Sequence, residues 1–276
     1  MARLRRLVPF IVALVGLILP GAAASAKTQP LPLILATTTS TQDTGLLDAL
    51  LPAFEKQTNI RVKVIAVGSG EALAMGRRGD ADVLLVHSKV AEEEFMAEGH
   101  GFARFDVMHN DFVLMGPAAD PARVRGVAAI EAFRRIAAAA ALFVSRGDRS
   151  GTHVKELGLW KQTGVEPQGQ AWHVSAGQGM GETARIASQK QAYALIDRGT
   201  WLALSPGLDL PVLCEGGEDL LNRYRVIVLD PAKHPQAHVR EAWTFAKWLV
   251  SPKTQKRIGE FGVAKYGRPL FVPDAK

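Results

Sequence analysis

Residues 33–51 read LILATTTSTQDTGLLDALL, and this stretch sets the pattern for the rest of the chain. The apolar run LIL is followed by a block of Thr and Ser, and then by leucines at helical spacing. The stretch therefore predicts a strand, a turn rich in hydroxyl groups and a helix. One hydroxyl is enough to cap the first turn of a helix. The excess of hydroxyls predicts that this turn also holds a ligand.

Three further turns have the same character. GSG at residues 68–70 follows a predicted strand over 61–67, SRGDRSGT at 145–152 follows one over 141–144, and SAGQGMG at 175–181 follows one over 171–174. Each of these turns is followed by a predicted helix. The chain thus repeats a strand, a turn rich in Gly, Ser or Thr, and a helix N-terminus four times.

Such turns are suited to binding an anion. The first N–H groups of a helix have no intrahelical partner, and the helix dipole places partial positive charge beside them. Glycine lets the backbone approach a ligand closely, and hydroxyls add neutral donors. In an open α/β sheet these turns lie at the carboxyl ends of the strands, where ligands bind. Four of them predict one shared anion site.

Alternating strands and helices predict α/β sheets with helices on both faces. The length favours two lobes, with crossings near residues 110–116 and 205–217, where turn residues collect. We expect the Pro-rich C-terminus to loop over the surface and Pro52 to kink or shorten its helix. The expected strands are residues 33–36, 61–67, 82–86, 102–115 (one strand or two), 141–144, 171–174, 201–204 and 226–229. The expected helices are residues 45–57, 71–78, 89–98, 127–141, 152–163, 182–196, 237–250 and 254–261.

The N-terminus has the pattern of a secretory signal peptide over residues 1–26. Three arginines precede the apolar run of residues 7–19, and Ala24-Ser25-Ala26 fits a cleavage site. An N-terminal membrane anchor is the alternative. The segment carries three positive charges and no negative ones, so its removal lowers the net charge from +6 to +3. The single Cys214 cannot form a disulfide within the chain. These features predict a soluble periplasmic protein that relies on its apolar core.

Arg146 is the charged residue most favourably placed in these turns. A guanidinium at this strand end can neutralise part of a dianion and donate two hydrogen bonds. The alternative is a surface Arg paired with Asp148. Four carboxylates near the turns are interpreted as first-turn residues favoured by the dipole, whereas a carboxylate inside the site would select a protonated ligand such as hydrogen phosphate. These carboxylates are Asp43, Glu71, Asp148 and Glu182.

Several other classes of function lack their sequence signals. No Lys follows the Gly-rich turns, so a nucleotide P-loop is not predicted, and no basic block with interleaved aromatics indicates nucleic-acid binding. The histidines show no zinc-binding spacing. Ser150, His153 and Asp148 could suggest an exported hydrolase. Their positions at one helix start do not place a base against a nucleophile, and a GxSxG elbow is absent from the sequence.

Five segments together resemble a known family. They are LATTTSTQDTGLLDALLPAFE, VGSGEALAMGRRGDADVLLVHS, SRGDRSGTHVKE, GQGMGETARIAS and AYALIDRGTWLAL, and they extend from about residue 33 to 204. The chain is similar in them to the tungstate-binding proteins of bacterial ABC importers. The resemblance implies a class II periplasmic binding protein, with two α/β lobes joined by a two-strand hinge. We assign residues 27–112 and 205–276 to the first lobe and residues 113–204 to the second.

The same resemblance implies the ligand, the partners and the contacts. The ligand would be tungstate, with molybdate as a competitor, and the partners a membrane permease and its ATPase. We expect a monomer that has no cofactor, is not an enzyme, and binds the oxyanion without direct protein–metal bonds. The implied ligand-binding residues are Thr38, Thr39, Ser40, Ser69, Arg146, Ser150, Gly151, Thr152 and Met180, the last through its backbone N–H.

The residues alone leave the choice of oxyanion open. A fully deprotonated tetrahedral dianion offers only acceptors, so a site made only of donors suits it. Tungstate, molybdate and sulfate all meet that description and differ mainly in size. A binding protein for molybdate, sulfate or phosphate is therefore the nearest alternative, and tungstate rests on the resemblance.

Overall fold

A computed structural model describes residues 32–148 and 150–275 of the chain. The predicted signal peptide lies outside these residues. Within the described part, no helix has both the length and the apolar character needed to cross a membrane.

A mixed sheet forms the first part of the fold, with strand order β10-β4-β9-β3-β1-β2. Its parallel strands β2, β1 and β3 come from the strand–turn–helix units predicted above. The strands β9, β4 and β10 are antiparallel to their neighbours. The bounds are β1 Leu33–Thr38, β2 Val62–Val67, β3 Val83–Val86, β4 Gly101–Met115, β9 Leu221–Leu229 and β10 Val272–Pro273.

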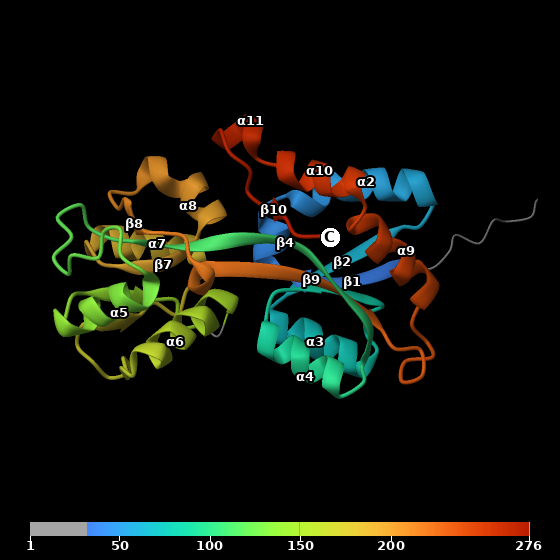
Figure 1. Cartoon of the computed structure of the whole chain (residues 1–276), viewed down its shortest axis with the longest axis horizontal. Coiled ribbons are helices and arrows are strands. Elements are labelled where there is room, and N and C mark those ends of the chain that lie inside the picture. The colour runs from blue at the N-terminus through green and yellow to red at the C-terminus, as the bar shows by residue number, and fades with distance from the viewer. Residues whose placement is uncertain (1–31, 149, 276) are drawn as a thin grey trace, which may run out of the picture. The chain divides into compact units, whose positions relative to one another are not determined.

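Successive side chains of β1 point to opposite faces of the sheet, and each face packs in a different apolar cluster. Leu33 and Leu35 pack with the helices α2 and α9, whereas Ala36 packs with α3 and α4 on the opposite face (Figure 1). The sheet is therefore covered on both sides, as the alternating pattern predicts. The helices of this part are α1 Thr39–Asp43, α2 Leu46–Thr58, α3 Ser69–Arg78, α4 Lys89–Ala97, α9 Val239–Leu249, α10 Pro252–Glu260 and α11 Val263–Tyr266.

Two long strands, β4 and β9, connect this part to a second group of elements. They pair from Gly101 and Leu229 to Asp111 and Leu221. The last residues of β4 then pair with β7 and β8 (Figure 1). The bounds in this second group are α5 Ala129–Ala138, β5 Phe143–Ser145, α6 Gly151–Thr163, β6 His173–Ser175, α7 Met180–Gln189, β7 Ala194–Asp197, α8 Arg198–Leu204 and β8 Val212–Cys214, with short 3-10 turns at Ser205–Gly207 and Glu218–Leu220.

The second group has apolar clusters of its own. Trp160 packs edge to face against Phe133 and Phe143, with ring centroids 4.5 and 5.3 Å apart, and Phe133 is tilted against Phe143 at 5.5 Å. A second cluster joins Val144 to Met180. These clusters fix the ends of β5 and β6 beneath the starts of α6 and α7.

Most expected elements are present, and two expectations are wrong. The helix expected over residues 182–196 ends at Gln189, and residues 194–197 form β7, because pairing with β4 buries this apolar segment. The strand expected over 201–204 is part of α8. The carboxylate of Asp197 caps that helix by accepting from the N–H of Thr200 at 2.8 Å.

Three smaller expectations are also settled. Residues 101–115 form one strand, and Pro52 lies inside α2 without ending it. The C-terminal segment does not simply loop over the surface, because Phe271 is fully buried and β10 pairs with β4.

Candidate ligand site

The TTTS turn begins α1, and its hydroxyls have different roles. Thr38 is the N-cap, and its Oγ1 accepts from the N–H of Thr41 at 3.3 Å. Thr39 is exposed. Ser40 Oγ lies 3.1 Å from Thr38 Oγ1. Thr37 is a structural residue that donates to the carbonyl of Leu85 at 2.8 Å. The hydroxyl block therefore combines capping, sheet anchoring and groups that can face a ligand.

Ser69 is the first residue of α3, after Gly68 in extended conformation. The residue is buried, with 6% of its surface exposed, and its Oγ has no hydrogen-bond partner among the described residues. A buried hydroxyl without a partner is costly, so this atom is placed to meet an added acceptor.

The SRGDRSGT turn positions Arg146 at the end of β5. Its side chain is 14% exposed, and its Nη2 donates to Asp148 Oδ2 at 2.5 Å. Its Nε is buried and has no partner in the described part of the chain. Arg146 is thus paired with Asp148, which is what the alternative interpretation of the sequence expects. Its Nε remains available to donate to another acceptor.

Two carboxylates balance this guanidinium. Burial alone would raise the pKa of Asp148, but hydrogen bonds from Ser150 and the charge of Arg146 outweigh it and lower that pKa. Burial raises the pKa of Asp197, and the bonds from Thr200 and the charge of Arg146 oppose the rise. Arg146 is paired with Asp148, and a bound dianion would compete with that carboxylate for it.

The start of α6 presses against the end of β3. Ser150 is its N-cap, and its Oγ accepts from the N–H of His153 at 3.3 Å. A Cβ on Gly151 would lie 2.8 Å from Cε1 of His87, so only glycine fits here without displacing the ring. Thr152 is buried, with 7% of its surface exposed. The backbone amides of this first turn are thereby held next to residues of the first sheet.

Met180 begins α7 after Gly179, which provides no side-chain cap. The first amides of this helix therefore lack intrahelical acceptors. The Met180 side chain packs in the same cluster as Val144, so the start of α7 flanks the end of β5 and hence Arg146.

A cluster of buried polar side chains, at the place where β4 pairs with β9, is the part of the site that sequence patterns do not reveal. Asn222 Nδ2 donates to Asn110 Oδ1 at 2.8 Å and to the Tyr224 hydroxyl at 3.0 Å. The His87 ring packs against Tyr224, with ring centroids 4.6 Å apart, and burial lowers the pKa of His87 to about 4. In the sequence, Asn110 and Asn222 interrupt apolar strands. Such an interruption can indicate a buried polar cluster, but it can equally indicate a turn.

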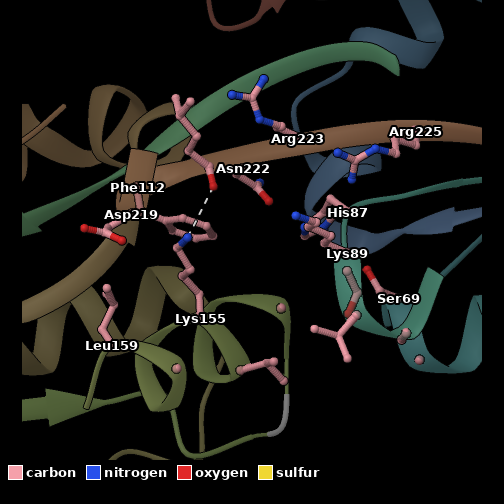
Figure 2. A pocket seen from close by; sticks show the side chains of 18 of the residues that line it. Ser69, His87, Lys89, Phe112, Lys155, Leu159, Asp219, Asn222, Arg223 and Arg225 are labelled. Atoms are coloured by element: carbon pink, nitrogen blue, oxygen red, sulfur yellow. Dashed lines mark hydrogen bonds between the residues drawn. The ribbon is translucent and has the colours of Figure 1, made fainter. Parts of the chain in front are cut away.

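A cleft of about 930 Å³ opens beside this paired part of β4 and β9. Figure 2 shows Ser69, His87 and Lys89 on one wall, Lys155 and Leu159 of α6 on the other, and β9 with Asn222 and Arg223 along the floor. Lys155 Nζ donates to the carbonyl of Leu221 at 3.3 Å. Of the expected ligand residues, Ser69 and Gly151 line this cleft together. The other expected ligand residues, Arg146 and those of the TTTS turn among them, do not line it.

The cleft is lined by both cationic and anionic side chains, with Glu94, Glu218 and Asp219 as the carboxylates. The described residues hold no group of three or more His, Cys, Asp or Glu side chains that could bind a metal ion. The groups that can meet an anion are helix-start amides, the Ser69 hydroxyl and the cationic side chains of the cleft, which are Lys89, Lys155, Arg223 and Arg225. The arrangement fits an anion held by hydrogen bonds.

This fold, together with a donor-lined site between strand ends, defines a solute-binding protein. Residues 21–253 match the family model described as a PBP superfamily domain, and the chain belongs to that superfamily. Within it the chain belongs to the family of tungstate-binding TupA proteins. It is 47% identical over 285 residues to the tungstate-binding protein TupA of Peptoclostridium acidaminophilum, covering 99% of each chain.

Solved structures give the same result. The tungstate-binding protein TupA from Desulfovibrio alaskensis G20 is 46% identical, with a TM-score of 0.82 over 89% of this chain and 100% of that one. The tungstate ABC transporter protein from Geobacter sulfurreducens is also 46% identical, with a TM-score of 0.73 over 83% of this chain and 98% of that one. The α/β fold of the periplasmic binding proteins is thereby confirmed. The family consists of binding components of transporters and not of enzymes.

Proposed function

We propose that the chain is the periplasmic solute-binding component of an ABC importer and that it captures tungstate, with molybdate as a competitor. The relatives' names support the choice of ion. Delivery to a membrane permease driven by an ATPase follows from this role. Export of the chain through the N-terminal segment, and action as a monomer, are parts of the same proposal.

One observation carries the oxyanion assignment. Two donors, Arg146 Nε and Ser69 Oγ, are buried without a partner among the described residues, beside helix starts whose amides are also open. A tetrahedral dianion offers acceptors in several directions at once. It can satisfy such separated donors together, which a neutral solute of the same size cannot do.

We propose that the ligand is bound by residues from both groups of elements that β4 and β9 connect. Thr38, Thr39, Ser40 and Ser69 contribute from one side; Arg146, Ser150, Gly151, Thr152 and Met180 contribute from the other. We propose two lobes on either side of β4 and β9. Leu210, Leu213 and Leu220 pack in the clusters of the second group, so that lobe extends beyond residue 204 to about residue 220.

Lobe closure over the ion follows from a site with contributions from both lobes. The exposed Val90 and Val154 line the cleft, one beside each wall, and closure would cover them. A hydrolase is disfavoured by the geometry, because the Ser150 hydroxyl accepts from the backbone of His153 as a helix cap.

Isothermal titration calorimetry tests the proposal. The mature chain is titrated with tungstate, molybdate, sulfate and phosphate at the same pH and ionic strength. We expect saturable heat with tungstate and weaker or competing binding of molybdate. A stronger response to sulfate or phosphate would reassign the ligand, and absence of heat with all four would refute the oxyanion function.

A further inference from the structure

The C-terminal part of the chain carries a concentration of positive charge. Residues 253–268 contain five Lys or Arg and a single acid, Glu260, which gives this segment a net charge of +4. The mature chain has a net charge of +3, so its remaining residues together carry −1. The five cations, which we call the basic patch, are Lys253, Lys256, Arg257, Lys265 and Arg268. The net positive charge of the mature chain therefore resides in the basic patch.

Three residues of the basic patch lie on one face of α10. Lys253, Lys256 and Arg257 have i, i+3 and i+4 spacing and are exposed. The buried residues of the same helix are Thr254, Gln255 and Ile258. Lys265 of α11 and Arg268 just after it are exposed as well, and Figure 1 shows α10 and α11 next to each other at one edge of the molecule. All five charges are thus presented to solvent.

The packing of α10 fixes the basic patch in place, away from the ligand site. Ile258 is fully buried in the cluster that contains Leu33 and Leu35, and Gln255 Nε2 donates to the Leu249 carbonyl at 3.0 Å. The helix packs on the face of the sheet opposite to α3 and α4 (Figure 1). The residues of the basic patch do not line the cleft. A partner bound to the patch would therefore leave the cleft free.

Local structure does not account for these charges. Of the five residues, only Lys256 has an ion pair within the described part of the chain, with Glu260 at 3.8 Å. Lys253 lies in the first turn of α10, where the helix dipole disfavours a cation. It is also four residues from Arg257, and like charges at this spacing weaken a helix. The arrangement lowers the stability of α10 and suits a partner that supplies the negative charge.

A membrane surface with anionic lipids has the properties that the basic patch requires. The buried side of α10 belongs to the core, so the helix can lie on a charged surface but cannot insert into it. Val263, which is 42% exposed between the two parts of the patch, adds an apolar contact. Each Lys or Arg beside such a surface strengthens binding about fivefold, and mobile lipid headgroups can adjust to charges spread along a helix.

We propose that the basic patch is a docking surface for anionic phospholipid headgroups, which holds the chain at a membrane while the cleft stays free. For a binding component of a transporter, this contact would keep the chain close to its permease. The inference goes beyond the proposed function and does not depend on which oxyanion the cleft binds.

Co-sedimentation with lipid vesicles tests the proposal. The mature chain is used, because the basic and apolar N-terminal segment would bind lipid by itself. We expect binding to vesicles of equal parts phosphatidylcholine and phosphatidylglycerol, and no binding to vesicles of phosphatidylcholine alone. Binding should be lost at about 1 M salt, where the Debye length is about 3 Å.

Two triple variants separate the basic patch from net charge. Lys253→Gln/Lys256→Gln/Arg257→Gln removes three charges with residues that favour a helix. It should bind the anionic vesicles about 100-fold more weakly and keep the melting temperature and the tungstate affinity of wild type. The matched control removes three exposed cations of the second group of elements and should bind the vesicles nearly as well as wild type. Its changes are Arg125→Gln, Lys161→Gln and Lys190→Gln.

The outcomes decide between a lipid surface and its alternatives. A wild-type chain that ignores the anionic vesicles, or equal losses in the two triple variants, would refute the proposal. Binding to poly-glutamate without binding to the vesicles would also refute it and would indicate an acidic protein partner. If the patch variant unfolds, Lys265→Gln/Arg268→Gln must still weaken vesicle binding about 25-fold. Tungstate calorimetry is unaffected by any of these results, so failure here leaves the proposed function standing.

Discussion

Replacement of Arg146 by alanine is the perturbation with the largest expected effect on affinity. The side chain carries a buried Nε without a partner in the described part of the chain and an Nη2 that donates to Asp148. A hydrogen bond to a charged group contributes about 1.5–3 kcal/mol, so Arg146→Ala should raise the dissociation constant for tungstate about 10- to 150-fold. The upper end is favoured, because Asp148 would then lose the counter-charge that Arg146 provides.

The assay is calorimetry at fixed ionic strength, with two comparison variants. Arg146→Lys keeps the charge but lacks the planar fork, so it should recover only part of the loss. Arg134→Ala removes an exposed arginine paired with Glu131 on α5 at 2.9 Å and should leave the affinity unchanged. An Arg146→Ala chain that binds tungstate as tightly as wild type would refute the role assigned to this guanidinium.

Three further expectations follow from the same contacts. Ser69→Ala should weaken tungstate binding by about 0.5–1.5 kcal/mol with little change in melting temperature. Thr37→Val, which loses the bond to Leu85, should lower the melting temperature and leave tungstate affinity nearly unchanged. Equal effects of the two changes on affinity and melting temperature would contradict a ligand role for Ser69 and a structural role for Thr37. Since the folded-state pKa of His87, about 4, lies below the unfolded value of 6.5, the ligand-free protein should lose stability as pH falls from 6.5 toward 4. Between pH 7 and 4.5, the free energy of unfolding in urea should fall by roughly 2 kcal/mol more for wild type than for His87→Gln. Equal falls in the two chains would count against a buried neutral imidazole. Small-angle scattering should give a smaller radius of gyration with tungstate than without, and an unchanged radius would argue against lobe closure.

Local sequence is sufficient to locate the helix starts of the site. A strand, then Gly or Ser, then a helical repeat predicts where β2 gives way to α3 and where Gly79 ends that helix in left-handed conformation, with φ of 74°. These features depend on neighbouring residues alone, so the four turns follow from the sequence.

Features that depend on distant residues do not follow in this way. Residues 194–196 carry apolar side chains compatible with a helix, and only pairing with β4 makes residues 194–197 a strand. The roles of Thr37 and Thr38 differ because adjacent residues of a strand point to opposite faces, and the sequence does not show which face meets the ligand. Asn222 and Tyr224 become part of the site only because β9 pairs with β4 there.

A crystal structure of the mature chain grown with tungstate, with anomalous data collected at a tungsten absorption edge, tests the central claim most directly. We expect one strong anomalous peak within hydrogen-bonding reach of Arg146, Ser69 and the first amides of α6 and α7. A peak coordinated by carboxylates or histidines, or lodged away from these helix starts, would contradict the account.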